Sequence, residues 1–171
     1  MPAKKPTYIY CLDDHRSFSD DVRKKFSDHD LYDVCSFQNT GDLREKLFSG
    51  KGRSMCRIVI IGLNDNDEQM NMVSDLVKEI KDHDATIGVI ILYSADKINE
   101  PGNSIINADA FVPKNSNMIL RIHNAVKKHI SEHTIRLLTK RRNLSLLIIS
   151  IFAVVSALAA LLAYLRYPQY F

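Results

Sequence analysis

Residues 57–63 read RIVIIGL, and residues 86–93 read TIGVIILY. Both runs are apolar almost throughout, without the alternation of polar and apolar residues that a strand with one wet face shows. A run of this kind is typical of a strand that is buried on both faces of a parallel sheet. Because such a sheet has to be covered by helices on both sides, the two runs predict an α/β domain.

Further strands and helices are predicted on either side of these two runs. Three more strands are expected at Thr7 to Leu12 (TYIYCL), Tyr32 to Phe37 (YDVCSF) and Ala110 to Val112. Helical periodicity predicts helices at Ser17 to Ser27, at Thr40 to Ser49 with Thr40 as cap, at Glu68 to Lys81 with Met72 on its apolar face, around Ser104, and after a Ser116 cap. Five strands that alternate with helices indicate one domain built on a parallel sheet.

The stretch from Leu144 to Leu165, LSLLIISIFAVVSALAALLAYL, contains no charged residue. As a helix it would reach roughly 33 Å, which is enough to cross the hydrocarbon core of a bilayer. Lys140, Arg141 and Arg142 precede it and only Arg166 follows, so the positive-inside rule places the N-terminal part in the cytoplasm. We therefore expect a single-pass membrane protein with a C-terminal anchor.

Charge is divided unequally along the chain. Residues 127–171 hold seven Lys and Arg and one acid, a net charge of +6, whereas residues 1–126 carry −3. The basic residues expected at an anionic lipid surface are Lys127, Lys128, Arg136, Lys140, Arg141 and Arg142. Since the rest of the chain is mildly acidic, nucleic acid is not an expected partner.

Other motifs give no support to an enzyme. The three cysteines (Cys11, Cys35 and Cys56) have no C-x-x-C spacing and are expected to be buried apolar side chains in a reducing compartment. His129 to His133 fits the zinc-peptidase pattern H-x-x-E-H, but no Asp or Glu follows Glu132 as a further ligand. A hydrated helical face is the expected reading of these histidines, and no G-x-G-x-x-G, P-loop or G-x-S-x-G motif is present.

Polar residues follow three of the predicted strands. Asp13 and Asp14 follow the first, Ser94 and Ala95 the fourth, and Lys114 the fifth. In an open parallel sheet these positions meet at the carboxyl edge. The set resembles the receiver domain of two-component response regulators, in which two acids hold Mg²⁺, a Ser or Thr and a Lys contact the phosphoryl oxygens, and an aspartate after the third strand accepts the phosphoryl group.

The resemblance implies a flavodoxin-like (CheY-like) three-layer sandwich with a five-stranded parallel sheet, followed by one transmembrane helix. It also places Phe111 as the switch-like aromatic residue. A Toll/interleukin-receptor-like domain shares this architecture but does not predict the Asp-Asp, Ser-Ala and Lys set. The expected divisions are an N-terminal tail (1–6), a receiver-like domain (7–130), a basic juxtamembrane helix (131–143), the transmembrane helix (144–165) and a short non-cytoplasmic tail (166–171).

The departures from the family pattern define the expected function. Gly62 stands where the family has its acceptor aspartate, and Asn115 replaces the proline that usually follows the lysine. The chain thus resembles a pseudo-receiver that is not an enzyme and works as an interaction or signalling module. No cofactor is expected, apart from Mg²⁺ as a candidate at Asp13 and Asp14. Otherwise these two carboxylates are expected either to be vestigial or to form a salt bridge with Lys114.

Two alternatives remain open from the sequence. Asp65 or Asp67 in the following loop could accept a phosphoryl group, or the protein could be an oligomerising membrane effector. The expected partners are the membrane, a cytoplasmic or membrane protein, and a second copy of the chain. By resemblance, the expected contact face combines the fourth strand, the helix after it, the fifth strand and the last helix.

Overall fold

A computed structural model of the chain describes residues 6–13, 16–49, 55–63, 67–94 and 106–166. It divides into two compact units, residues 1–131 and residues 132–171, which are described separately below. The predicted short helix around Ser104 lies outside the described residues.

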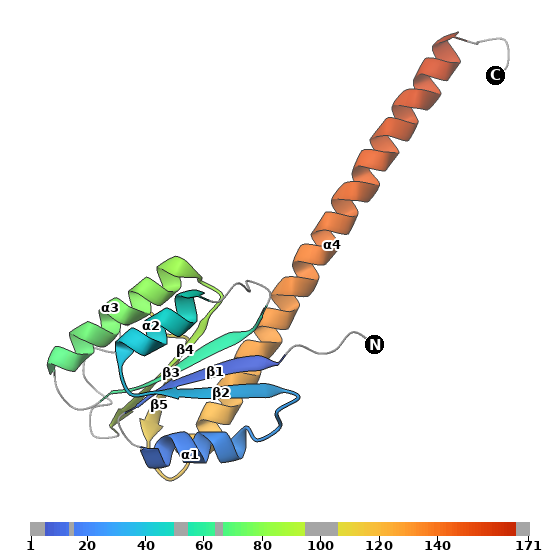
Figure 1. Cartoon of the computed structure of the whole chain (residues 1–171). Helices are drawn as coiled ribbons and strands as arrows, with labels where there is room; N and C mark the ends of the chain where they lie inside the picture. The colour runs from blue at the N-terminus through green and yellow to red at the C-terminus, as the bar shows by residue number, and fades with distance from the viewer. Residues whose placement is uncertain (1–5, 14–15, 50–54, 64–66, 95–105, 167–171) are drawn as a thin grey trace. The chain divides into compact units, whose positions relative to one another are not determined.

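The first unit is built on a five-stranded sheet in which every pair of neighbours is parallel (Figure 1). Its order is β2-β1-β3-β4-β5, which places the two apolar runs beside each other at and next to the centre. The strands are β1 (Thr7–Leu12), β2 (Tyr32–Phe37), β3 (Arg57–Gly62), β4 (Gly88–Ser94) and β5 (Ala110–Lys114). The flavodoxin-like architecture predicted from the sequence is confirmed.

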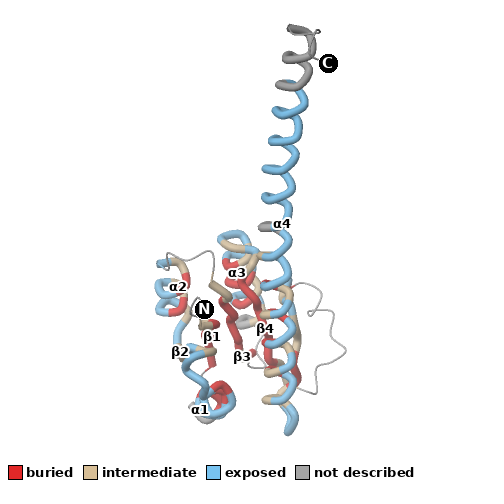
Figure 2. The backbone as a smooth tube through the Cα atoms, turned by 90° about the vertical axis from the view of Figure 1, so that its right-hand side faces the viewer, coloured by how far each residue is buried: buried red, intermediate tan, exposed pale blue. Residues whose placement is uncertain are grey.

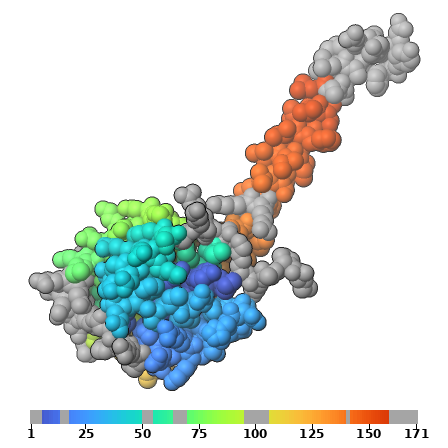
Figure 3. Space-filling view, viewed as in Figure 1, coloured from blue at the N-terminus to red at the C-terminus, as the bar shows by residue number. Residues whose placement is uncertain are grey.

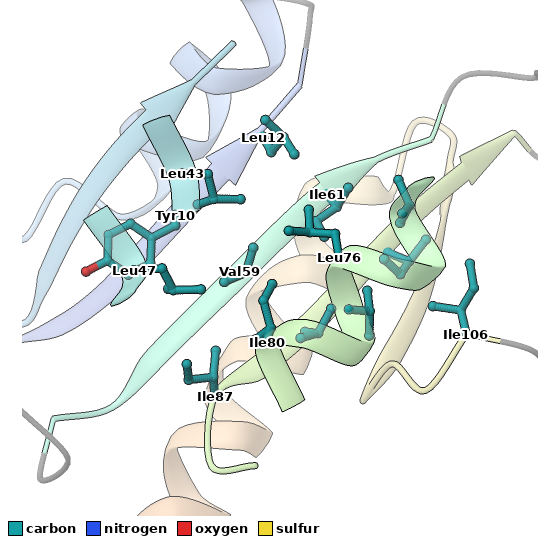
Figure 4. Packing of buried hydrophobic residues seen from close by; sticks show 14 of the residues in the cluster. Tyr10, Leu12, Leu43, Leu47, Val59, Ile61, Leu76, Ile80, Ile87 and Ile106 are labelled. Atoms are coloured by element: carbon teal, nitrogen blue, oxygen red, sulfur yellow. The ribbon is translucent and has the colours of Figure 1, made fainter. Parts of the chain in front are cut away.

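Helices cover both faces of the sheet. They are α1 (Arg16–Lys25), α2 (Thr40–Ser49), α3 (Asp67–His83) and α4 (Met118–Arg166). Two buried clusters show how they pack: Leu43 and Leu47 of α2 meet α3 over one face, and Phe18 and Val22 of α1 meet the start of α4 over the other. Figure 4 shows the first cluster from close by, with side chains of α2 and α3 against β1 and β3.

β3 and β4 are the most deeply buried strands, and the buried part of Figure 2 follows them. Ile58 and Ile60 face one cluster, whereas Val59 and Ile61 face the other. Each fully buried aliphatic side chain contributes about 1.5–3 kcal/mol to folding by the area removed from water. The absence of a polar face in these strands therefore fixes the three-layer arrangement.

Three local predictions were wrong, and each has a local cause. The cap of α2 is Asn39 rather than Thr40, because Asn39 Oδ1 accepts the N–H of Asp42 at 2.8 Å. Ahead of α4, the side chain of Asn115, rather than that of Ser116, accepts a hydrogen bond. The main-chain N–H of Asn117 donates it. Met72 is 61% exposed because it lies at the edge of the apolar stripe of α3.

The amino ends of the strands are held by an ion pair that sequence reasoning did not predict. Arg57 Nη2 lies 2.7 Å from Asp84 Oδ2, and Arg57 Nη1 donates to the Leu47 carbonyl at 3.0 Å. Burial raises the pKa of Asp84, but hydrogen bonds from Thr86 and Arg57 outweigh it and lower the pKa overall. The pair thus joins β3 to the loop before β4.

The histidines of the H-x-x-E-H pattern do not form the hydrated face predicted for them. His129 and His133 are each only 8% exposed. His129 Nε2 lies 3.2 Å from the Thr86 carbonyl oxygen, and its ring lies over Gly88. The helical pattern alone gave no sign of this burial, since it depends on a glycine in another element.

The second unit, residues 132–171, is the continuation of α4. Its large apolar residues from Leu144 to Leu158 are between 55% and 73% exposed, and they lie in the pale-blue part of the helix in Figure 2. In the described residues, Met118–Leu158 is the one helix that is long and apolar enough to cross a membrane by length and composition.

A Gly88→Ala substitution is expected to lower the free energy of unfolding by about 1–3 kcal/mol, because the core at this position has no room for a methyl group. An ideal Cβ at position 88 would lie 2.8 Å from three ring atoms of His129. Urea unfolding of the full chain in detergent micelles, followed by the tyrosine circular dichroism signal, measures the change. Gly41→Ala is the control, since its Cβ would meet only Asn39 Oδ1 at 3.4 Å. Equal stability of the two variants would contradict the packing described here.

Candidate functional site

The carboxyl edge of the sheet brings together four of the predicted site residues. Asp13 directly follows β1, and its neighbour Leu12 pairs with Ile61, so Asp13 comes beside Gly62 at the end of β3. On the other side of β3, Ser94 pairs with Lys114 across β4 and β5. Asp14 and Asp65 lie outside the described residues, as does the side chain of Asp67.

The Asp13 carboxylate fills the space above Gly62. An ideal Cβ at position 62 would overlap Asp13 Oδ2 and would lie 2.8 Å from Asp13 Cγ, closer than a Cβ comes to such atoms in real structures. The Asp13 side chain is only 3% exposed. Glycine at position 62 therefore leaves no vacancy, because a carboxylate from the neighbouring strand end takes the place of the missing side chain.

Lys114 balances this buried charge. Its Nζ lies 3.7 Å from Asp13 Oδ2 and donates a hydrogen bond to the Leu63 carbonyl at 3.0 Å. The ion pair expected from the sequence is therefore present. A buried carboxylate without a cation nearby would be costly, so the pair ties the end of β5 to the ends of β1 and β3.

The predicted magnesium site at Asp13 and Asp14 stays a prediction, because Asp14 lies outside the described residues. In the described ranges, no three Asp, Glu, His or Cys side chains come together as metal ligands. Gly62 offers no ligand, and Asp13 Oδ2 faces an ammonium group, whose positive charge opposes a cation. Mg²⁺ prefers several oxygen ligands at short range, which one ion-paired carboxylate does not supply.

The other two predicted residues, Ser94 of the pocket and the switch-like Phe111, lie on β4 and β5. Ser94 is partly exposed at the end of β4. Phe111 is partly buried and packs against the cluster that α2 and α3 form. Its ring therefore lies on the face of the sheet that α2 and α3 cover. The neighbouring Asp109 has a structural contact, since it accepts the N–H of Val89 at 2.7 Å and pairs with Lys81.

Of the three cysteines that were predicted to be buried, Cys11 is buried, whereas Cys35 and Cys56 are only partly buried. Cys11 is fully buried, and burial raises the pKa of its thiol to about 12. Burial likewise raises the pKa of Cys56 to about 11, and that of Cys35 above its ordinary value. Because the thiolate is the reactive form, these three thiols are poor nucleophiles near neutral pH.

Four of the six predicted membrane-surface basic side chains are described, and all four are exposed: Lys127, Lys128, Arg136 and Arg142. The side chains of Lys140 and Arg141 lie outside the described residues. Exposure leaves the described cations free to face a negatively charged surface.

Comparison of the fold with solved structures returns receiver-containing proteins. NtrX from Brucella abortus in complex with ADP shares 17% identity over 81% of this chain, with a TM-score of 0.58, and the chain spans only 30% of the length of NtrX. The response regulator TrrA from Thermotoga maritima in complex with Mg²⁺ and BeF shares 19% identity over 72% of this chain and 98% of its own length, with a TM-score of 0.53.

A receiver domain protein from Clostridium thermocellum shares 18% identity, covers 75% of this chain and 98% of its own length, and gives a TM-score of 0.57. No family model and no curated protein matches the sequence. At these identities the similarity establishes the fold alone: the first unit of this chain has the fold of response-regulator receiver domains.

A Lys114→Met substitution is expected to lower the free energy of unfolding by about 1–3 kcal/mol, because it leaves the Asp13 carboxylate buried without its cation. Asp13→Asn combined with Lys114→Met should cost less than the sum of the two single changes, since the double variant buries no unpaired charge. Urea unfolding of the full chain in micelles gives all three values. Additive effects would show that the pair is not coupled.

Proposed function

We propose that this chain is a membrane-tethered pseudo-receiver that acts as an interaction or signalling module without phosphorylation and without enzymatic activity. The observation that carries the proposal is the occupation of the acceptor position. Where the family has a nucleophilic aspartate, Asp13 lies over Gly62 and is paired with Lys114.

Phosphoryl transfer depends on positioning an acceptor beside a metal ion that neutralises the developing charge. In the described part of this pocket, Gly62 has no side chain to act as acceptor, and the one carboxylate in its place is buried and ion-paired. A receiver fold that keeps its sheet and its core but has glycine at the acceptor position can still present surfaces to a partner. NtrX and the response regulator TrrA, which have a similar fold, support a role for this chain in signalling.

The membrane tether rests on a separate observation. An apolar helix that is more than half exposed over Leu144 to Leu158 is unfavourable in water and favourable in lipid. The charge asymmetry around it favours a cytoplasmic first unit, and the basic residues before it favour anionic lipids. We propose the membrane, a protein partner and further copies of the chain as the binding partners of this module.

Incubation of the full chain with Mg²⁺ and acetyl phosphate should leave its intact mass unchanged, because the described pocket holds no free acceptor. The same measurement on Asp65→Asn and Asp67→Asn variants serves as control. If the parent gains a phosphoryl group that one of these variants fails to gain, a loop aspartate is the acceptor and the proposal is wrong.

The tether is tested at the middle of the predicted span. Val154→Arg combined with Val155→Lys should release the protein from membranes into the soluble fraction, because each central charge costs about 2.5–3.5 kcal/mol of insertion. Val154→Leu with Val155→Ile, which keeps the span apolar, should stay in the membrane after alkaline carbonate extraction. If the helix lay in water instead of a membrane, the charged variant would be more soluble than the parent but would be found in the same fraction.

A further inference from the structure

The two edges of the sheet differ in how they are protected against further pairing. β5 contains Pro113 and ends at Lys114, and both residue types discourage the addition of a strand. β2, at the opposite edge, reads YDVCSF and has neither a proline nor a lysine. Among the strands that the structure describes, none pairs with its outer side.

The main chain of β2 presents specific groups at that edge. The N–H of Thr7 donates to the Leu31 carbonyl, which sets the phase of the ladder between β1 and β2. Because a parallel ladder uses alternate residues, the main-chain groups of Val34 and Ser36 point away from β1. The N–H of Tyr32 also points outward, but it donates to the Asp28 carbonyl at 2.8 Å. Val34 and Ser36 are therefore the free pairing positions.

Two cavities lie along this edge beside α1. One has a volume of about 260 Å³ and is lined by Asp13, Ser19, Asp20, Arg23, Ser36, Phe37 and Gln38. The other, of about 540 Å³, is lined by Arg23, Lys24, Phe26, Ser27, His29, Asp33 and Val34. Consecutive residues of β2 line each cavity, so the cavities reach the strand edge itself rather than one face of the sheet. Figure 3 shows the surface to which α1, β2 and α2 contribute.

Two polar groups at this edge have no partner of their own. The Ser36 hydroxyl is buried and makes no hydrogen bond within the part of the chain that the structure describes. A buried polar group in this condition calls for a ligand or water to satisfy it. Arg23 is exposed, lines both cavities, and takes part in no ion pair that the described residues form.

The charge of Arg23 acts on the strand ends. Burial raises the pKa of both Cys11 in β1 and Cys35 in β2, and the Arg23 charge opposes that rise in each case. Lys24 lines only the second cavity, so Arg23 is the basic residue common to both. A carboxylate seated between the cavities would therefore meet a guanidinium group, the donor that best matches it.

We propose that the outer edge of β2 is a docking site for an extended segment of a partner protein, which adds to the sheet as a strand and places an acidic side chain against Arg23. The main-chain groups of Val34 and Ser36 supply the pairing, and the cavities beside α1 take alternate side chains. This inference rests on the proposed function as an interaction module and names the surface and the chemistry of its partner.

A second copy of the chain fits this edge less well. Two copies joined through β2 by a two-fold axis would bring α1 beside α1, and Arg23 and Lys24 of one copy would approach the same cations of the other. Like charges at such short range disfavour the pairing. An acidic side chain directed into the larger cavity instead meets two cations, Arg23 and Lys24, and one acid, Asp33.

The test begins with the full chain in phosphatidylcholine nanodiscs and a displayed library of random heptapeptides. Selected peptides should be rich in β-branched residues and carry Asp or Glu. Once bound, they should slow hydrogen exchange at residues 32–37, as measured by mass spectrometry. Peptides that leave exchange at 32–37 unchanged, or that carry no acid, would overturn the inference.

Variants separate pairing from charge. Arg23→Glu should weaken binding about tenfold or more, as expected when a close charge pair is reversed. Arg121→Glu makes the same charge change at an exposed position of α4 and should have no effect. Val34→Pro removes an outward N–H at a position where an edge strand tolerates proline, and should abolish binding. Val34→Thr keeps that N–H and should bind normally. If Val34→Pro fails to fold, the two charge variants decide the question.

Protection of residues 32–37 that rises with protein concentration in the absence of peptide would mean that a second copy occupies the edge, and would also overturn the inference. The proposed function fails by a different result, the gain of a phosphoryl group in the intact mass. The two failures are therefore distinguishable.

Discussion

The structure depends on the burial of β3 and β4 on both faces. Neither strand has a polar face, so each is stable only between two layers of helices, and the helices must carry apolar stripes on the sides that face the sheet. Polar chemistry is then confined to the places where strands end and to the two outer edges. The ion pair of Asp13 with Lys114, the ion pair of Arg57 with Asp84, and the open edge of β2 all lie at such places.

Two glycines on the inner strands have the same structural role at opposite ends of the sheet. Gly62 makes room for the Asp13 carboxylate at the carboxyl end, and Gly88 makes room for the His129 ring at the amino end. In each case a side chain from another element lies on the strand where a Cβ would otherwise be. A glycine in an inner strand costs backbone entropy, so its presence is explained by the close approach that it permits. Gly62 is therefore part of the packing of this pocket.

The sequence predicted the strands, the main helices and the sheet class because these follow from the period of apolar residues, which a single chain displays. It also brought Asp13, Gly62, Ser94 and Lys114 to one edge, since parallel strands end on the same side. It could not predict that His129 and His133 are buried or that Asp13 lies over Gly62, because both depend on distances between elements far apart in the chain. The open edge left a partial signal: the second predicted strand has no proline, whereas Pro113 directly follows the fifth predicted strand, which in the structure extends to Lys114.

An unprotected edge strand is a hazard in a protein that diffuses freely, because any extended chain can pair with it. In the proposed arrangement the tether changes this balance. A module held at a bilayer meets partners held at the same bilayer at a high effective concentration, so a contact with few hydrogen bonds is enough for binding. The cations of α1 beside β2 also act against self-pairing, because they repel the same cations of a second copy. A weak and charge-selective edge is thus better suited to a membrane-held module than to a soluble one, and the tether and the edge support each other.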